Sequence, residues 1–218
     1  MLCSGDSRVS YGPREKPVCR PFYRLNAQAA AKVVVSLARM EQGNFSQVKG
    51  VGGGVFEYKL DFGPGYRGYV GKDGETLVIL LRWGNEETAA ERHRHGKVPL
   101  AGLQTKKKAG ELTMPLTRSF KATIQTRVRS DPAFRDALLR EGVESLLAGD
   151  VENGKAVLRD YINATIGFEE LGVLADKSAK SLMRMFGPRG NPQAKNLFEV
   201  IGHLQKQEGV QLEVHAVR

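Results

Sequence analysis

Residues 168–186, FEELGVLADKSAKSLMRMF, decide the fold of the C-terminal half of the chain. Apolar side chains recur at helical spacing on both sides of Asp176-Lys177, so the pattern predicts one short helix from Phe168 to Ala175 and a second from Ser178 to Phe186. The apolar residues that would pack these helices are Leu171, Leu174, Ala175, Leu182, Met185 and Phe186. Asp176 stands in the turn, where glycine is usual because it adopts a positive φ at little cost. We therefore expect two helices that pack across a tight turn.

Two helices of this length joined in this way have the geometry of a helix-turn-helix, which lays its second helix in the major groove of DNA. Cationic and hydroxyl side chains there can reach phosphates and base edges, and arginine is the usual reader of guanine. The free backbone N–H groups at the start of the following helix favour a phosphate. The predicted DNA-binding residues are Lys177, Ser178, Lys180, Ser181, Arg184, Arg189, Asn191, Gln193 and Lys195. The alternative is the ordinary polar face of a helical bundle.

The rest of the C-terminal half is also helical in pattern. One helix is predicted from Thr117 to Arg129. Asp131-Pro132 is an N-cap followed by proline at the first helical position, and it opens a helix that ends near Gly149. Asp150 is expected to cap the next helix, and Asn191-Pro192 repeats the cap and proline before the last one. The alternating Val210, Leu212 and Val214 then predict a C-terminal strand over residues 210–216.

The N-terminal half has a different pattern. Residues 1–22 show no period, an apolar stripe predicts a helix over residues 26–42, and Gly50 to Gly54 is typical of a glycine-rich turn. Three strands are predicted, at residues 56–62, 66–72 and 76–81, with Asp73-Gly74 as a hairpin turn between the last two. Residues 85–113 have no period and are predicted to be a linker.

Charge also divides the chain near Met114, where a methionine at the join suggests that two adjacent reading frames have been read as one. The formal net charge is +9; residues 1–113 have 18 lysines and arginines against 11 aspartates and glutamates, whereas residues 114–218 have 15 against 13. A basic surplus favours RNA or DNA as a partner, and simple solubility is the alternative. Cys3 and Cys19 are the two cysteines, so neither a disulfide framework, a metal cluster nor a cofactor is predicted. The longest apolar run, Leu77 to Leu81, is too short to span a bilayer.

The C-terminal half resembles the HigA-like addiction-module antidote proteins, which have a helix-turn-helix of the Xre/Cro type. The residues that carry the resemblance are DPAFRDALL at 131–139, GKAVLRDYINATIGFEEL at 154–171, KSLMRMFGPRGNPQAKNLF at 180–198 and EGVQLEV at 208–214. The resemblance implies a DNA-binding autorepressor that acts as a homodimer on a palindromic double-stranded operator and also binds a toxin. It further implies a bacterial cytoplasmic protein.

Residues 24–83 resemble the partner of that family, the HigB-like killer proteins of the RelE/ParE superfamily. The resemblance rests on RMEQGNF at 39–45, VKGVGGGVFEYKLDFGPGYR at 48–67 and KDGETLVILL at 72–81. It implies a small sheet with helices on one side and a metal-independent endoribonuclease that cuts mRNA on the ribosome. Cationic side chains would hold the scissile phosphate, and by position these are Arg67 and, more weakly, Lys59. The chain departs from the family at Arg82-Trp83-Gly84-Asn85-Glu86-Glu87, where acidic residues stand in place of glycines and lysines.

The expected fold class is therefore α+β, with a small RelE-like sheet and helix joined to an all-α helix-turn-helix bundle that ends in a strand. The expected parts are residues 1–22 (poorly patterned), 23–84 (toxin-derived), 85–113 (linker) and 114–218 (antitoxin). One reading is a DNA-binding repressor with a neutralised or inactive toxin half. The second is an mRNA interferase inhibited in cis by its fused antitoxin, and the third is a module that captures other toxins or antitoxins. Docking of the halves within one chain or between chains stays open at this point.

Overall fold

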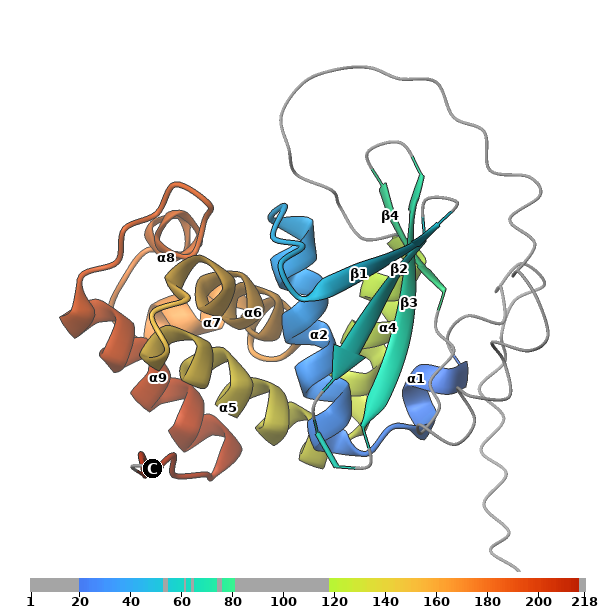
Figure 1. Cartoon of the computed structure of the whole chain (residues 1–218). Helices are drawn as coiled ribbons and strands as arrows, with labels where there is room; N and C mark the ends of the chain where they lie inside the picture. Colours follow the sequence, from blue (N-terminus) through green and yellow to red (C-terminus); the bar gives the residue numbers. More distant parts are fainter. Residues whose placement is uncertain are drawn as a thin grey trace, which may run out of the picture.

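The computed structural model describes residues 20–52, 55–60, 62–63, 65–73, 76–80 and 118–215, and these form an α+β fold (Figure 1). The N-terminal part contains α1 (Arg20–Arg24), α2 (Ala27–Glu41), β1 (Val48–Gly52), β2 (Val55–Leu60), β3 (Tyr66–Asp73) and β4 (Thr76–Leu80). The C-terminal part contains α4 (Arg118–Ser130), α5 (Pro132–Leu147), α6 (Val151–Ala164), α7 (Gly167–Leu174), α8 (Ala179–Met185) and α9 (Ala194–Glu208). The predicted linker at 85–113 and the acidic Glu86-Glu87 pair lie outside the described residues.

The four strands form an antiparallel sheet in the order β1-β2-β3-β4. Tyr58 and Leu60 of β2 are buried on the face that α2 covers, where the Tyr58 hydroxyl bonds to Ser36. The three predicted strands are therefore confirmed, although Glu57, on the face of β2 expected to be polar and exposed, is buried as well. Asp73 pairs with Thr76 as the last residue of β3, so it belongs to the strand and not to the predicted Asp73-Gly74 turn. Gly74 lies outside the described residues.

Two predictions for the N-terminal part are wrong. Residues 48–52, the first three of the predicted glycine turn included, form β1, an exposed edge strand held by backbone pairing to β2. Because backbone hydrogen bonds need no apolar side chains, this strand left no period in the sequence. The unpatterned stretch ending at residue 22 contains the start of α1, whose Phe22 is completely buried. The boundary expected between residues 22 and 23 therefore falls inside a helix.

The predicted helices of the C-terminal part are confirmed, but two predicted caps and the last strand are not. Asp131 caps α5 by accepting from the Phe134 N–H at 3.1 Å. Asp150 is at the start of α6 without a side-chain capping bond, and α9 begins at Ala194 after Gln193 rather than after Asn191-Pro192. Residues 210–215 form no strand, since this segment pairs with no strand of the described residues.

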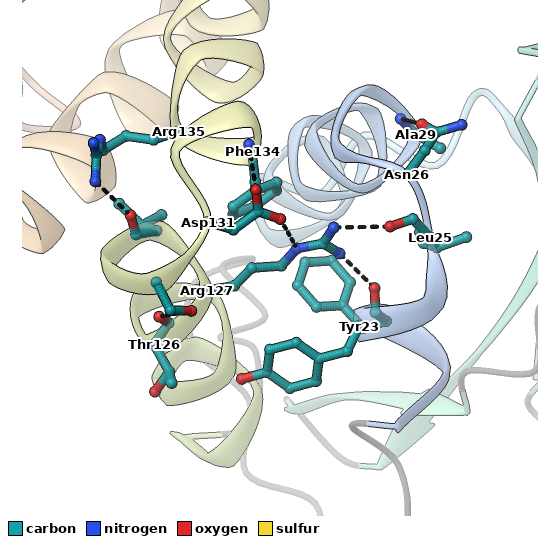
Figure 2. Close-up of polar contacts among 12 residues, drawn as sticks. Tyr23, Leu25, Asn26, Ala29, Thr126, Arg127, Asp131, Phe134 and Arg135 are labelled. Carbon is teal, nitrogen blue, oxygen red and sulfur yellow. Dashed lines mark hydrogen bonds and ion pairs between the residues drawn. The ribbon is translucent and has the colours of Figure 1, made fainter. Parts of the chain in front are cut away.

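The two parts dock onto each other within one chain through Arg127 of α4, whose side chain is 5% exposed. Figure 2 shows its guanidinium reaching from α4 toward the α1–α2 segment, where it donates to the carbonyls of Phe22 at 2.5 Å and Leu25 at 2.8 Å. It also pairs with Asp131 and lies 5.1 Å and 4.8 Å from the ring centres of Phe22 and Phe134. The docking therefore combines buried charge-assisted hydrogen bonds with cation–π contacts.

Ion pairs extend the contact between the two parts along α2. These pairs are Lys32–Glu141 at 2.7 Å, Arg39–Asp150 at 2.7 Å and Glu41–Lys121 at 2.9 Å. Burial raises the pKa of Glu141, although Lys32 acts against that shift. Residues of both parts belong to one continuous apolar core, so the C-terminal part does not pack as an independent unit.

Candidate nucleic-acid interface

The joint between α7 and α8 is a tight turn over residues 175–178. Asp176 adopts φ 49°, the only positive φ of a non-glycine residue in the described part of the chain. The Lys177 N–H donates to the Gly172 carbonyl at 2.9 Å, and a Cβ on Gly172 would lie 2.7 Å from the Lys177 carbonyl oxygen. The two helices therefore approach so closely that only glycine fits at position 172.

Helix α8 has one buried face and one exposed face, as predicted. Leu182 and Phe186 are at most 1% exposed, and the Phe186 ring lies 6.3 Å from that of Phe168. Ser178, Lys180, Ser181 and Arg184 are exposed, and the Ser178 hydroxyl caps α8 by accepting from the Ser181 N–H at 3.2 Å. Leu174, predicted as a packing residue, is instead 47% exposed at the last position of α7.

The cations of this surface differ in whether a carboxylate neutralises them. Lys177 donates to Glu199 of α9 at 2.7 Å, and this hydrogen bond lowers the pKa of Glu199. Lys180, Arg184, Arg189 and Lys195 are all exposed, and no carboxylate of the described residues lies within ion-pair distance of them. Because they are exposed and have no ion-pair partner among the described residues, these four of the five predicted cations are available to an anionic partner.

The segment between α8 and α9 holds the remaining predicted residues. Arg189, Asn191 and Gln193 are exposed. This loop lies at the end of α8 and leads into the first turn of α9, which carries Lys195 (Figure 1). The nine predicted DNA-binding residues therefore lie on α8, the turn before it, the loop after it and the first turn of α9, within 19 consecutive positions.

The two predicted catalytic residues are cross-strand neighbours, since Lys59 of β2 pairs in register with Arg67 of β3. They lie on the face of the sheet opposite to Tyr58 and Leu60, because side chains alternate along a strand. Arg67 donates to Glu57 at 2.5 Å, and the Glu57 side chain is only 9% exposed. The Arg67 guanidinium is thus paired with a buried carboxylate of the adjacent strand. A phosphate bound at Arg67 would have to compete with that carboxylate.

Comparison with known proteins gives one relative. A Haemophilus influenzae protein, described as uncharacterized, is 37% identical over 73 residues, which make up 34% of this chain and 74% of that protein. The chain belongs to the same family as this Haemophilus protein. No protein-family model matches the chain, and no solved structure matches it. The description of this relative names no activity or ligand.

The sequence patterns did not identify three residues that contact the two candidate sites, the surface around α8 and the Lys59–Arg67 pair. Glu199 of α9 bonds to Lys177, and Lys155 of α6 bonds to the Gly190 carbonyl; both residues thus contact the predicted DNA-binding surface, Lys155 from a helix that lies earlier in the chain. Glu57 is ten residues from Arg67, and the register of the β2–β3 pair was the signal that could have found it. Among the described helices, none combines the length and the apolar composition needed to cross a membrane.

Proposed function

We propose that the chain is a DNA-binding transcriptional autorepressor in which α7 and α8 act as an Xre/Cro-type helix-turn-helix. Helix α8 would enter the major groove, and a homodimer would match a palindromic operator. The observation that carries the proposal is the surface formed by α8, the following loop and the first turn of α9, where four exposed cations have no carboxylate of the described residues beside them. Arg184 would read a base edge, whereas Lys195 would contact phosphate.

In this proposal the N-terminal part is a RelE/ParE-like, HigB-like toxin-derived unit that is held in cis by the antitoxin-like part. The ion pair between Arg67 and Glu57 supports an inactive unit, because the carboxylate opposes phosphate binding at that arginine. The alternative is an mRNA interferase inhibited by its fused antitoxin. It is favoured by the placement of Lys59 directly across from Arg67, where two cations could share one phosphate.

The first test is a footprint of the full chain on the DNA upstream of its own gene, with Arg184→Ala beside it. Loss of the guanidinium is expected to weaken operator binding by about 1–3 kcal/mol and to relax base preference at one position. Arg129→Ala is the matched control, because it removes an equally exposed arginine from α4, away from α8. Operator binding unchanged by Arg184→Ala would mean that α8 is not the recognition helix. No protected site for the wild type at modest salt would favour the self-neutralised toxin.

Lys195→Ala is expected to weaken binding to all DNA sequences alike and to reduce the slope of log affinity against log salt by about one unit. The physical reason is that a phosphate contact releases a counterion but carries no sequence information. Fluorescence anisotropy over a salt series measures the slope, with Lys206→Ala at the far end of α9 as control. If the control lowers the slope equally, the first turn of α9 does not face DNA.

A further inference from the structure

Lys155 of α6 is a buried lysine that contacts the loop between α8 and α9. The residue is 1% exposed, yet its ammonium group donates to the Gly190 carbonyl at 2.5 Å and pairs with Glu152 at 2.7 Å. An ammonium removed from water is costly unless it is bonded, so the two contacts are required for this burial. Helix α6 thus fixes the position of a loop 35 residues further along the chain.

The loop itself is folded back against the end of α8. The Gly190 N–H donates to the Gly187 carbonyl at 2.9 Å, and the Gly187 N–H donates to the Arg184 carbonyl at 3.2 Å. A Cβ on Gly190 would overlap the backbone oxygens of Arg184 and Met185. Because Lys155 bonds to the backbone carbonyl of Gly190, it holds the main chain of the loop. The residues on either side, Arg189 and Asn191, are directed outward and are exposed.

We propose that Lys155 is a positioning residue for base recognition, an inference that rests on the proposed function. By fixing Gly190 it sets where Arg189 and Asn191 lie relative to α8. These two residue types read guanine and adenine edges in the major groove of double-stranded DNA. Lys155 is buried beneath the loop and makes no DNA contact itself. Its loss removes base discrimination while the exposed cations still attract phosphate.

The test is Lys155→Met, which keeps most of the length of the unbranched side chain and removes the ammonium. In amide hydrogen exchange, the Gly190 amide is expected to exchange at least tenfold faster, whereas the Lys177 amide in the α7–α8 joint keeps its rate. The ratio of affinities for the gene's own upstream DNA and for unrelated DNA of equal length falls at least tenfold. The salt slope on unrelated DNA stays the same, since no phosphate contact is lost.

The control is Ile162→Val, which trims one methyl group from a fully buried residue of the same helix. It is expected to lower stability slightly and to leave the affinity ratio unchanged, which separates positioning from destabilisation. Equal exchange of the Gly190 amide in Lys155→Met and wild type overturns the inference, and so does an unchanged affinity ratio. A wild-type chain that does not discriminate between the two DNAs overturns the proposed function instead.

Discussion

Replacing Arg127 with methionine is expected to lower the free energy of unfolding by about 3–5 kcal/mol, the range seen when one partner of a buried charged pair is removed. The guanidinium donates to the carbonyl of Phe22, which belongs to α1, and to that of Leu25, which lies between α1 and α2. Each hydrogen bond from a charged donor is worth about 1.5–3 kcal/mol. Methionine fills the space between the rings of Phe22 and Phe134 but leaves the two carbonyls without this donor.

Urea unfolding followed by circular dichroism measures this effect. Because Arg127 joins the N-terminal part to α4, we also expect the unfolding transition of the variant to be broader than that of the wild type, or to divide in two. Arg129→Met is the matched control, since Arg129 is exposed in the same helix, and its effect should stay within about 0.5 kcal/mol. If the two variants have the same midpoint, the docking of the two parts does not depend on Arg127.

The sequence predicted those features that depend on local periodicity. The exposed face of α8, with Lys180 and Arg184 outward and Leu182 inward, follows from helical spacing alone. The alternation of β2 was equally visible, since one face of that strand packs against α2. Asp131 was identified as a cap because the signal, an aspartate before proline, lies within the helix start itself.

Features that depend on a distant partner were not visible in the sequence. β1 is a strand because β2 pairs with it, whereas residues 210–215 have strand-like alternation but pair with no strand of the described residues. Arg127 is surrounded in the sequence by polar and charged residues, and the two carbonyls to which it donates, those of Phe22 and Leu25, lie more than 100 positions away. Lysine is rarely buried, so composition gave no reason to place Lys155 inside.

The candidate site was predicted as a set of residues but not as an electrostatic surface. Lys177 was placed with the other cations of α8, yet Glu199 of α9 already holds it. Arg67 was likewise chosen by position in a strand, whereas its partner Glu57 is fixed by the sheet register. Which cations are available depends on tertiary contacts, and residue type does not report those contacts.

Gly172→Ala is expected to destabilise the chain by about 1–3 kcal/mol and to weaken operator binding more than tenfold. The new Cβ would lie 2.7 Å from the backbone oxygen of Lys177 and 3.3 Å from the Ala179 nitrogen. Both atoms belong to the backbone that leads into α8, so relief of the overlap must move α8 as a whole. A displaced α8 carries Lys180 and Arg184 out of register with the groove.

The same substitution at Gly202 of α9 is expected to have the opposite sign. An added Cβ there meets nothing within 4 Å, so alanine gains about 0.5–1 kcal/mol from the lower conformational freedom of the unfolded chain and its better helix propensity. Thermal unfolding and anisotropy on operator DNA measure both variants. Opposite signs follow only if the Lys177 carbonyl closes the space beside Gly172. A stabilised Gly172→Ala variant that still binds DNA would mean that the α7–α8 joint can accept a Cβ at position 172. The close contact with the Lys177 carbonyl would then not hold α8 in one position for the groove.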